Sequence, residues 1–321
     1  MTMLSVLIPT YKRKESLLEA LSSLQDQVCR DFEILVIDNA NEQDVLQAVK
    51  DFNINARISA KYIAEPKLGL NHARHAGVRS ASGQVLVFTD DDATFAPDWL
   101  SAYEEAFNQY PEMMAAGGPV RPIWETEPPE WLSDYMSYTE TYPIFSLMER
   151  GNKLSVSSDG TFFGVNMAIR KSVFEWTGFR PELYGPRTIG DGESGLNEDL
   201  RKNGHLVGYV PGAAVYHHIP ASRMSLAYIK RWAWHLGGAQ MYRRWQGRRR
   251  GFKSIVSEYF IIIHQYLLYW LKSLFSNGRK DPKSINTQFQ ASLGWCKLKY
   301  LFWVISDEKV KNALDMTRFN P

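Results

Sequence analysis

Residues 85–92 read Val-Leu-Val-Phe-Thr-Asp-Asp-Asp, an apolar run that ends in a threonine and three carboxylates. A continuous apolar run of this length is typical of a strand buried on both faces of a parallel sheet. Open α/β sheets bind ligands outside the carboxyl ends of their strands, so the acids are expected at a ligand site. Adjacent carboxylates raise one another's pKa, a cost that a divalent cation such as Mg²⁺ or Mn²⁺ removes. Taken alone, the acids fit a solvated loop before a helix near Pro97 better; the rest of the sequence favours the cation site.

Apolar runs alternate with helical patterns around this stretch. Strands are expected at 4–8, 33–38, 58–63 and 85–89, and helices at 14–27, 42–52, 70–81 and 98–109. This alternation predicts an α/β fold with a doubly wound, mostly parallel sheet. Candidate ligand-facing residues directly follow three of the strands: Pro9-Thr10, Asp38-Asn39 and Asp90-Asp91-Asp92. We therefore expect them together at one edge of the sheet.

The composition changes at Gly117, where Gly, Pro and Trp become frequent and periodicity is lost. Further strands are expected near 162–169 and 206–216, flanking a helix that starts around Gly195. From about Ser225 the chain is expected to be helical almost to its end. The sequence thus predicts three parts, residues 1–118, 119–224 and 225–321.

Composition narrows the possible functions. The chain has 321 residues, 45% of them hydrophobic, and its net charge of +2 gives no general electrostatic case for nucleic acid. Cys29 and Cys296 show no metal-ligand spacing, which disfavours a zinc site or disulfide scaffold and favours a reducing compartment. The apolar segment at 4–8 is too short for a signal peptide. A cytoplasmic protein is expected.

Several segments, in this order and spacing, resemble the motifs of family 2 glycosyltransferases with the GT-A fold. They are LSVLIPTYKR at 4–13, ILVIDN at 34–39, LGLNHAR at 68–74, FTDDDA at 88–93, FGVNMAIR at 163–170, GDGE at 190–193 before a helix, and VYHH at 215–218. The similarity covers about residues 3–240. The chain departs from the family in having Gly192-Glu193 where a Glu-Asp pair is usual, and in lacking the Gln-x-x-Arg-Trp signature of processive synthases, which favours single additions.

The resemblance implies an inverting glycosyltransferase, of hexosyltransferase type, that moves a sugar from a nucleotide-diphosphate-sugar to an acceptor hydroxyl. It places the reaction in surface polysaccharide or glycolipid synthesis, with a UDP-, GDP- or dTDP-sugar as donor, a glycan or lipid-linked acceptor, and Mn²⁺ or Mg²⁺ as cofactor. Residues 1–118 would bind the nucleotide-sugar, 119–224 would bind the acceptor and carry the catalytic base, and 225–321 would form a C-terminal helical extension.

The resemblance also implies roles for individual residues. The donor would be bound by Pro9, Thr10, Arg13, Asp38, Arg74, Asp90, Asp91 and Asn166. The metal would be held by Asp92, with Asp90 nearby and His218 as a further ligand. The catalytic base would be Glu193, with Asp191 as the competing candidate.

Structural roles are the alternative for several of these residues. Asp38 could cap the helix that follows it, and Glu193 or Asp191 could cap the helix near Gly195. Asn166 could satisfy neighbouring backbone groups. Strand alternation sends His217 and His218 to opposite faces, so only one of them is expected to serve the site.

The sequence disfavours two other classes of protein. A nucleotidyltransferase that forms nucleotide-sugars would open with a Gly-rich phosphate loop carrying a basic residue, which Pro9-Thr10-Tyr11 is not. A non-catalytic sugar-binding module would need neither the acid cluster nor a separate downstream carboxylate.

The C-terminal region is expected on the inner face of a membrane as a peripheral element. Apolar residues recur there at helical spacing: Val256, Phe260, Ile263, Leu267, Trp270 and Leu274. The run contains His264, Gln265 and Lys272 and falls short of the roughly 20 apolar residues that span a bilayer. The basic stretch at 243–253 would face anionic head groups. The alternative is a helical hairpin packed on the catalytic domain or on a second subunit in a homodimer.

Overall fold

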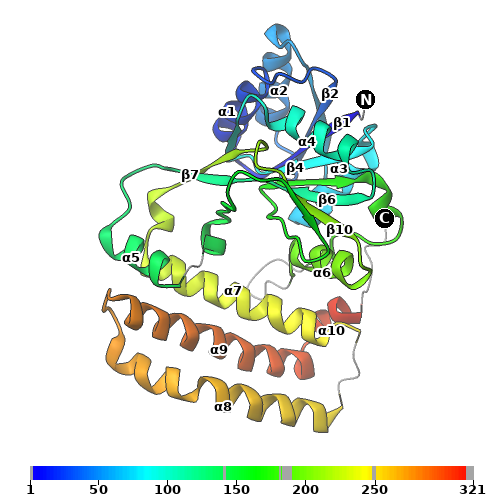
Figure 1. Cartoon of the computed structure of the whole chain (residues 1–321). Coiled ribbons are helices and arrows are strands. Elements are labelled where there is room, and N and C mark those ends of the chain that lie inside the picture. The colour runs from blue at the N-terminus through cyan, green and yellow to red at the C-terminus, as the bar shows by residue number, and fades with distance from the viewer. Residues whose placement is uncertain (1–2, 140–141, 181, 183–189, 248–250, 316–321) are drawn as a thin grey trace.

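An eight-stranded mixed sheet forms the centre of the first two parts of the chain, up to residue 224 (Figure 1). The computed structural model describes residues 3–139, 142–180, 182, 190–247 and 251–315. In spatial order the strands are β3 (Ala60–Ala64), β2 (Phe32–Asp38), β1 (Leu4–Thr10), β4 (Val85–Thr89), β9 (Asn166–Arg170), β6 (Met113–Gly117), β10 (Leu206–Tyr209) and β8 (Ser155–Ser157). Strands β1 to β4 pair in parallel, β9 is antiparallel to both of its neighbours, and β8 is antiparallel to β10. The predicted α/β fold with a mostly parallel sheet is confirmed.

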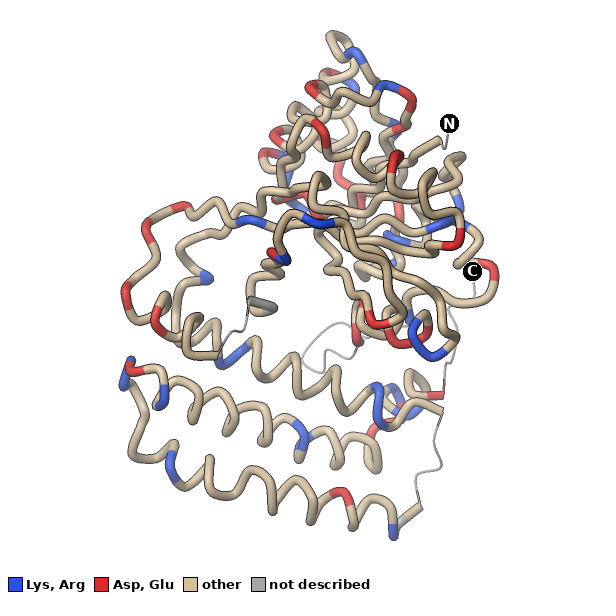
Figure 2. The backbone as a smooth tube through the Cα atoms, in the orientation of Figure 1, with Lys and Arg blue, Asp and Glu red and all other residues tan. Residues whose placement is uncertain are grey.

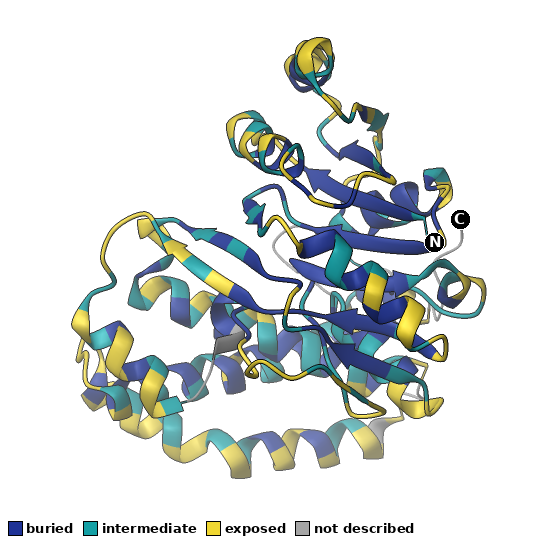
Figure 3. Ribbon diagram, turned by 45° about the horizontal axis from the view of Figure 1, so that its top comes forward, coloured by how far each residue is buried: buried dark blue, intermediate teal, exposed yellow. Residues whose placement is uncertain are grey.

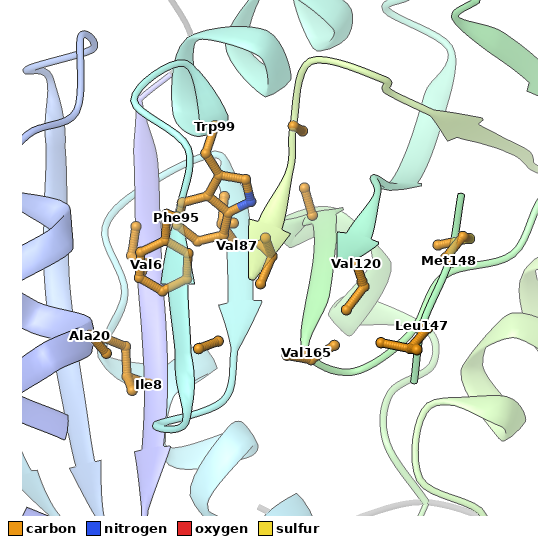
Figure 4. Close-up of a cluster of buried hydrophobic side chains, with 14 of the residues drawn as sticks. Val6, Ile8, Ala20, Val87, Phe95, Trp99, Val120, Leu147, Met148 and Val165 are labelled. Atoms are coloured by element: carbon orange, nitrogen blue, oxygen red, sulfur yellow. The ribbon is translucent and has the colours of Figure 1, made fainter. Parts of the chain in front are cut away.

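Side chains of successive strand residues enter two different cores, one on each face of the sheet. In β1, Val6 and Ile8 join one apolar cluster, whereas Leu7 joins the other. Figure 4 shows the first cluster, where Phe95 and Trp99 lie against Val6 and its neighbours. Helices follow the strands as predicted: α1 (Lys14–Leu24), α2 (Gln43–Asn55), α3 (Leu70–Ser80), α4 (Trp99–Gln109) and α6 (Ser194–Lys202).

A smaller sheet beside the acidic run joins strands from before and after residue 118. Its order is β5 (Ala93–Phe95), β11 (Val215–Ile219) and β7 (Val120–Trp124), and β11 is antiparallel to β5 but parallel to β7. Because β5 begins directly after the acids, this pairing brings the residues of β11 next to them. Strands β6, β8, β9 and β10 also belong to the large sheet, so residues on both sides of the predicted boundary at 118 share one sheet.

Two expected strands differ from prediction. The strand expected over 162–169 is shorter and antiparallel, as β9. The strand expected over 206–216 is two strands in different sheets, β10 and β11, because Pro211-Gly212 interrupts the apolar run. The region after Gly117 also holds α5 (Glu130–Thr139) and the short 3-10 helices η1 (Tyr142–Phe145), η2 (Lys171–Glu175) and η3 (Ala221–Arg223).

Long helices follow after residue 225, as expected. They are α7 (Leu226–Trp245), α8 (Phe252–Ser276) and α9 (Pro282–Ser306), followed by the short α10 (Glu308–Asp315). Helix α9 packs between α7 and α8, so α8 is the outermost of the three (Figure 1). Their core includes Tyr242, Trp245, Ile262 and Tyr300. Across the described ranges, every helix is too short or too polar to cross a membrane.

Candidate active site

The ends of strands β1, β2 and β4 lie together at one edge of the sheet, as predicted. Strands β1 and β2 end in register at Thr10 and Asp38. Strand β4, which pairs with the other edge of β1, ends at Thr89, directly before the acids. Thr10 Oγ1 donates a hydrogen bond to Asp91 Oδ2 at 2.7 Å. Arg13 Nη1 donates to Asp91 Oδ1 at 3.0 Å and to Asp92 Oδ2 at 2.9 Å. The loop after β1 therefore binds the acidic run directly.

Asp92 is held by basic side chains from separate parts of the chain. Besides Arg13, Arg223 Nη2 lies 3.2 Å from Asp92 Oδ2, and His217 Nε2 lies 3.5 Å from Asp92 Oδ1. Burial alone would raise the pKa of Asp92, but the hydrogen bond and charge of His217 and the charges of Arg223 and Arg13 outweigh it and lower the pKa to about 2. Asp92 is thus an ionised carboxylate near neutral pH.

Asp90 and Asp91 differ from Asp92 and from each other. Burial raises the pKa of Asp91 to about 6, although Arg13 and Thr10 oppose this shift. Burial and the negative charge of Asp92 raise the pKa of Asp90. Among the described residues, the carboxylate of Asp90 has no ion-pair partner within 4.0 Å. An additional cation beside Asp90 and Asp92 would therefore lower the energy of the site.

A cavity of about 520 Å³ opens over these acids. Its polar and aromatic lining comprises Thr10, Tyr11, Arg13, Asn39, Asp90, Asp91, Asp92, Ser146, His217, Arg223 and Tyr228, with Pro9 beside them. Six of the predicted site residues line it: Pro9, Thr10, Arg13, Asp90, Asp91 and Asp92. The sequence analysis also expected Asn39 at this edge of the sheet, but it missed Tyr11, His217, Arg223 and Tyr228. Only the acidic triplet's need for cations could have pointed to Arg223.

The structure places His217, and not the predicted His218, directly beside Asp92, although His218 lines another cavity that Asp92 also lines. Only His217 points at the cavity and at Asp92, and its Nδ1 is hydrogen-bonded to the carbonyl oxygen of Phe145 at 2.9 Å. His218 points to the other face of β11, where its Nε2 lies 3.4 Å from Thr94 Oγ1. The alternation itself was predicted, but the register of β11 against β5, which decides between the two, cannot be read from the sequence.

Two predicted donor-binding residues have their polar atoms fully used by the protein. The carboxylate of Asp38 accepts hydrogen bonds from three backbone N–H groups ahead of α2, at 40–42, and from the hydroxyl of Tyr62 at 2.8 Å. Asn166 Oδ1 accepts from Trp99 and Tyr103, and its Nδ2 donates to the carbonyl oxygens of Pro119 and Ala213. Both side chains are fully buried. Asn166 therefore has the structural role given as its alternative, whereas Asp38 binds the turn ahead of α2 and does not cap the helix, whose N-cap residue is Glu42.

Arg74 and Glu193 meet beside the acids but outside this cavity. Arg74 Nη1 lies 3.9 Å from Glu193 Oε2, and its guanidinium stacks over the ring of Phe179 at 5.0 Å. A Cβ on Gly164 would lie 2.3 Å from Arg74 Nη2 and 3.1 Å from Glu193 Oε2, so the pair fits only against a glycine. Both charges act on the pKa of Asp90, with Arg74 lowering it and Glu193 raising it. Arg74 and Glu193 are thus both close enough to Asp90 to act on its charge.

The two candidates for catalytic base lie in different environments. Glu193 precedes α6 without capping it, is partly exposed, and lines a second cavity of about 620 Å³. Asp191 is buried, and its Oδ2 accepts a hydrogen bond from Arg180 Nη1 at 3.0 Å. Burial raises the pKa of Asp191 to about 6, against the charge of Arg180. Of the two, Glu193 is the carboxylate that a substrate can reach.

The residues around Asp90 and Asp92 fit a divalent cation. Within the described part of the chain, no group of three or more His, Cys, Asp or Glu side chains is arranged as a complete metal site. Mg²⁺ is nevertheless commonly bound through one or two carboxylates together with substrate phosphates. Asp92, Asp90 and the imidazole of His217 provide that kind of partial ligand set, and the unpaired carboxylate of Asp90 favours a cation.

Comparison with known proteins assigns the chain to a family. The profile of Glycosyl transferase family 2 matches residues 5–177, so the chain belongs to this family. Over 172 residues, 53% of each chain, it is 27% identical to the glucosyl-dolichyl phosphate glucuronosyltransferase of Haloferax volcanii. It is 32% identical over 110 residues, 34% of this chain and 36% of the relative, to the GalNAc(5)-diNAcBac-PP-undecaprenol beta-1,3-glucosyltransferase of Campylobacter jejuni. Over 222 residues, 68% of each chain, it is 23% identical to the succinoglycan biosynthesis protein ExoM of Rhizobium meliloti.

Solved structures share the fold. A mannosyltransferase from Pyrobaculum calidifontis, in complex with GDP-Man and Mn²⁺, matches 98% of this chain and 83% of its own with a TM-score of 0.55 and 19% identity. S. aureus TarS in complex with UDP-GlcNAc matches 93% of this chain and 91% of its own with a TM-score of 0.52 and 14% identity. The chain therefore has the GT-A fold. It spans about half the length of the Haloferax relative and about a third of that from Campylobacter.

Proposed function

We propose that this chain is an inverting, metal-dependent hexosyltransferase that moves a sugar from a nucleotide-diphosphate-sugar to an acceptor hydroxyl. The observation that carries the proposal is that one cavity is lined by Asp90 and Asp92 and another by Glu193, whose neighbour Arg74 also acts on the pKa of Asp90. A cation-binding acid pair and a separate, reachable carboxylate are what transfer with inversion requires.

The donor occupies the cavity over the acids in this proposal. Its diphosphate lies near Arg13 and Arg223, whose guanidinium groups are suited to phosphate oxygens. Asp92 and Asp90 hold Mn²⁺ or Mg²⁺, with His217 in place of the predicted His218. The cation neutralises charge that develops on the leaving diphosphate. Family membership and the Mn²⁺ and GDP-Man bound by the Pyrobaculum neighbour support this assignment.

Glu193 takes the proton of the acceptor hydroxyl as the sugar is transferred. A hydroxyl is a poor nucleophile until a base accepts its proton, and Glu193 is at hand in the second cavity. Arg74, whose Nη1 lies 3.9 Å from Glu193 Oε2, orients this carboxylate.

The acceptor is a glycan or a lipid-linked saccharide in polysaccharide or glycolipid synthesis. Support comes from relatives named for dolichyl phosphate, undecaprenol and succinoglycan substrates or pathways. UDP-, GDP- and dTDP-sugars all remain candidates for the donor.

The outer face of α8 lies on an anionic membrane surface in this proposal. Large apolar side chains are exposed along α8: Tyr259, Phe260, Ile261, Leu267, Leu268, Leu271, Leu274 and Phe275 (Figure 3). The one acid in this helix, Glu258, is buried and paired with Arg244, whereas Lys253 and Lys272 are exposed. This combination of apolar and cationic groups suits lipid better than a second subunit. Of the predicted basic stretch, 248–250 lie outside the described residues.

Thermal unfolding with nucleotide-sugars tests the donor assignment. Mn²⁺ together with the correct UDP-, GDP- or dTDP-sugar is expected to raise the melting temperature, because a ligand bound only by the folded state stabilises it. Asp92→Ala is expected to lose this increase, and Asp98→Ala, which removes an exposed acid after β5, is expected to keep it. An absence of stabilisation by all three classes of donor would contradict the proposal.

A further inference from the structure

The cavity that contains Glu193 is lined by more basic than acidic side chains. It lies between the loop at 160–163, helix α6 and the C-terminal end of α7, and it holds Arg201, Arg243 and Arg244 together with Glu193 and Glu198. Figure 2 shows Lys and Arg gathered at that end of α7. These arginines come from two helices that are distant in sequence, so the cavity is where their charges meet.

The acids near this cavity are already paired. Glu198 Oε1 is bound by Lys202 Nζ at 2.6 Å, and Glu258 Oε2 is bound by Arg244 Nε at 2.5 Å. Glu193 lies close to Arg74. Within the described ranges, Arg201 and Arg243 have no carboxylate within 4.0 Å. Two guanidinium groups at the cavity are thus left without a direct counter-ion.

Helix geometry alone does not account for this arrangement. Arg201 and Arg243 each lie in the last turn of their helix, where a cation is favoured by the helix dipole. That effect would be satisfied by arginines pointing to solvent anywhere around the helix ends. It does not explain why both line one cavity of about 620 Å³ that also contains the reachable carboxylate.

We propose that Arg201 and Arg243 bind a phosphate group of the acceptor, so that the acceptor is a phosphate- or diphosphate-linked saccharide. This inference rests on the proposed function. Guanidinium groups bind phosphate oxygens through charge-assisted, often bidentate hydrogen bonds. An acceptor held by its phosphate at the ends of α6 and α7 has its sugar hydroxyl directed toward Glu193 in the same cavity. The site thereby selects anionic acceptors and fixes their orientation.

Binding of farnesyl phosphate, farnesol and inorganic phosphate to the full chain tests this proposal by calorimetry. The parent is expected to bind farnesyl phosphate but not farnesol. The double variant Arg201→Ala/Arg243→Ala is expected to bind farnesyl phosphate about 10-fold or more weakly, because hydrogen bonds to charged groups are lost. Arg57→Ala, an exposed arginine on the first half of the chain, serves as the control and is expected to bind as the parent does. Arg201→Lys/Arg243→Lys is expected to retain part of the affinity.

The same titrations distinguish a lipid-linked acceptor from a soluble phosphorylated one. Tighter binding of farnesyl phosphate than of inorganic phosphate assigns a lipid-linked acceptor, and equal binding assigns a soluble phosphorylated one. The proposal is overturned if no phosphate probe binds, or if the double alanine variant binds as tightly as the parent. Stabilisation by nucleotide-sugar and Mn²⁺ is measured separately on every variant, so a failure of the donor assignment is distinguishable from a failure at this cavity.

Discussion

Three consecutive aspartates occupy three different electrostatic environments. Asp92 has its pKa lowered to about 2, Asp91 has its pKa raised to about 6, and the pKa of Asp90 is also raised. The differences arise from burial and from partners that lie far away in sequence, which for Asp92 are above all His217 and then Arg223 and Arg13. The sequence alone predicts that the acids share a site, because they follow a buried strand. It does not predict which of them is ionised, because that depends on tertiary contacts.

Glu193→Gln is expected to lower the transfer rate by about 10²–10⁴-fold, the usual contribution of a positioned base. Glutamine keeps the size of the side chain but cannot take the proton, so donor and metal affinity should stay close to those of the parent. Single-turnover transfer and donor titration on Glu193→Gln and Asp191→Asn, side by side, measure both quantities. Full activity in Glu193→Gln together with inactivity in Asp191→Asn would reverse the assignment.

Asp191 is expected to affect stability in a pH-dependent way. Its pKa is raised to about 6 in the folded protein from a usual value of 3.8, so between these values the folded chain holds a proton that the unfolded chain has lost. Stability from this group therefore falls as pH rises from about 4 to 6. The free energy of unfolding of Asp191→Asn minus that of the parent should therefore rise by up to about 3 kcal/mol as the pH rises from 4 to 7.

Urea unfolding of the parent and of Asp191→Asn at pH 4, 5, 6 and 7 measures this difference. A difference between the two proteins that stays constant across the range would show that Asp191 titrates normally.

At the scale of elements, strand ends were predictable and strand partners were not. Buried apolar runs located β1, β2 and β4, and hence the edge where Thr10 and the acids meet. The pairing of β11 between β5 and β7 joins segments more than 90 residues apart, and local pattern carries no information about its register. For this reason the sequence predicted one site histidine in β11 but selected His218, whereas the structure turns His217 toward Asp92.

The register of β11 makes the two histidines a matched pair for mutagenesis. His217→Ala is expected to reduce Mn²⁺-dependent activity by at least about 10–100-fold, since this is already the usual effect of removing a residue that only positions a metal ligand. His218→Ala, on the other face of the strand, is expected to remain within about twofold of the parent, since surface changes are commonly near neutral. Manganese titrations of both variants measure this, and a larger loss in His218→Ala would contradict the geometry.

At the scale of the whole molecule, the α/β alternation and the long C-terminal helices were both predictable from periodicity. The structural roles of Asp38 and Asn166 were not, because they depend on donors and acceptors that tertiary folding brings to them. Likewise, the periodicity of α8 predicted its apolar stripe, but only the packing of α9 between α7 and α8 shows which part of that stripe is left exposed.

The exposed face of α8 is expected to bind vesicles that contain anionic lipid. In flotation at low salt, the parent should rise with anionic vesicles, and less with neutral ones, because cations near the surface contribute on the order of 1 kcal/mol each. Leu268→Asp/Leu271→Asp removes apolar contact on the exposed stripe and should stay in solution. Val28→Asp/Ile54→Asp adds the same charge at two exposed apolar positions elsewhere and should float. A parent that stays in solution as a dimer, made monomeric by the α8 variant, would assign this face to a second subunit instead.

Release of nucleoside diphosphate from a panel of UDP-, GDP- and dTDP-sugars tests the central claim most directly. The parent is expected to release it from one class of donor in the presence of Mn²⁺, and a chelator should stop the reaction. Asp92→Ala should abolish release while the variant remains folded, because a carboxylate needed to hold the cation is gone. Near-normal release by Asp92→Ala, or release by the parent that a chelator leaves unchanged, would contradict a metal-dependent glycosyltransferase site at the end of β4.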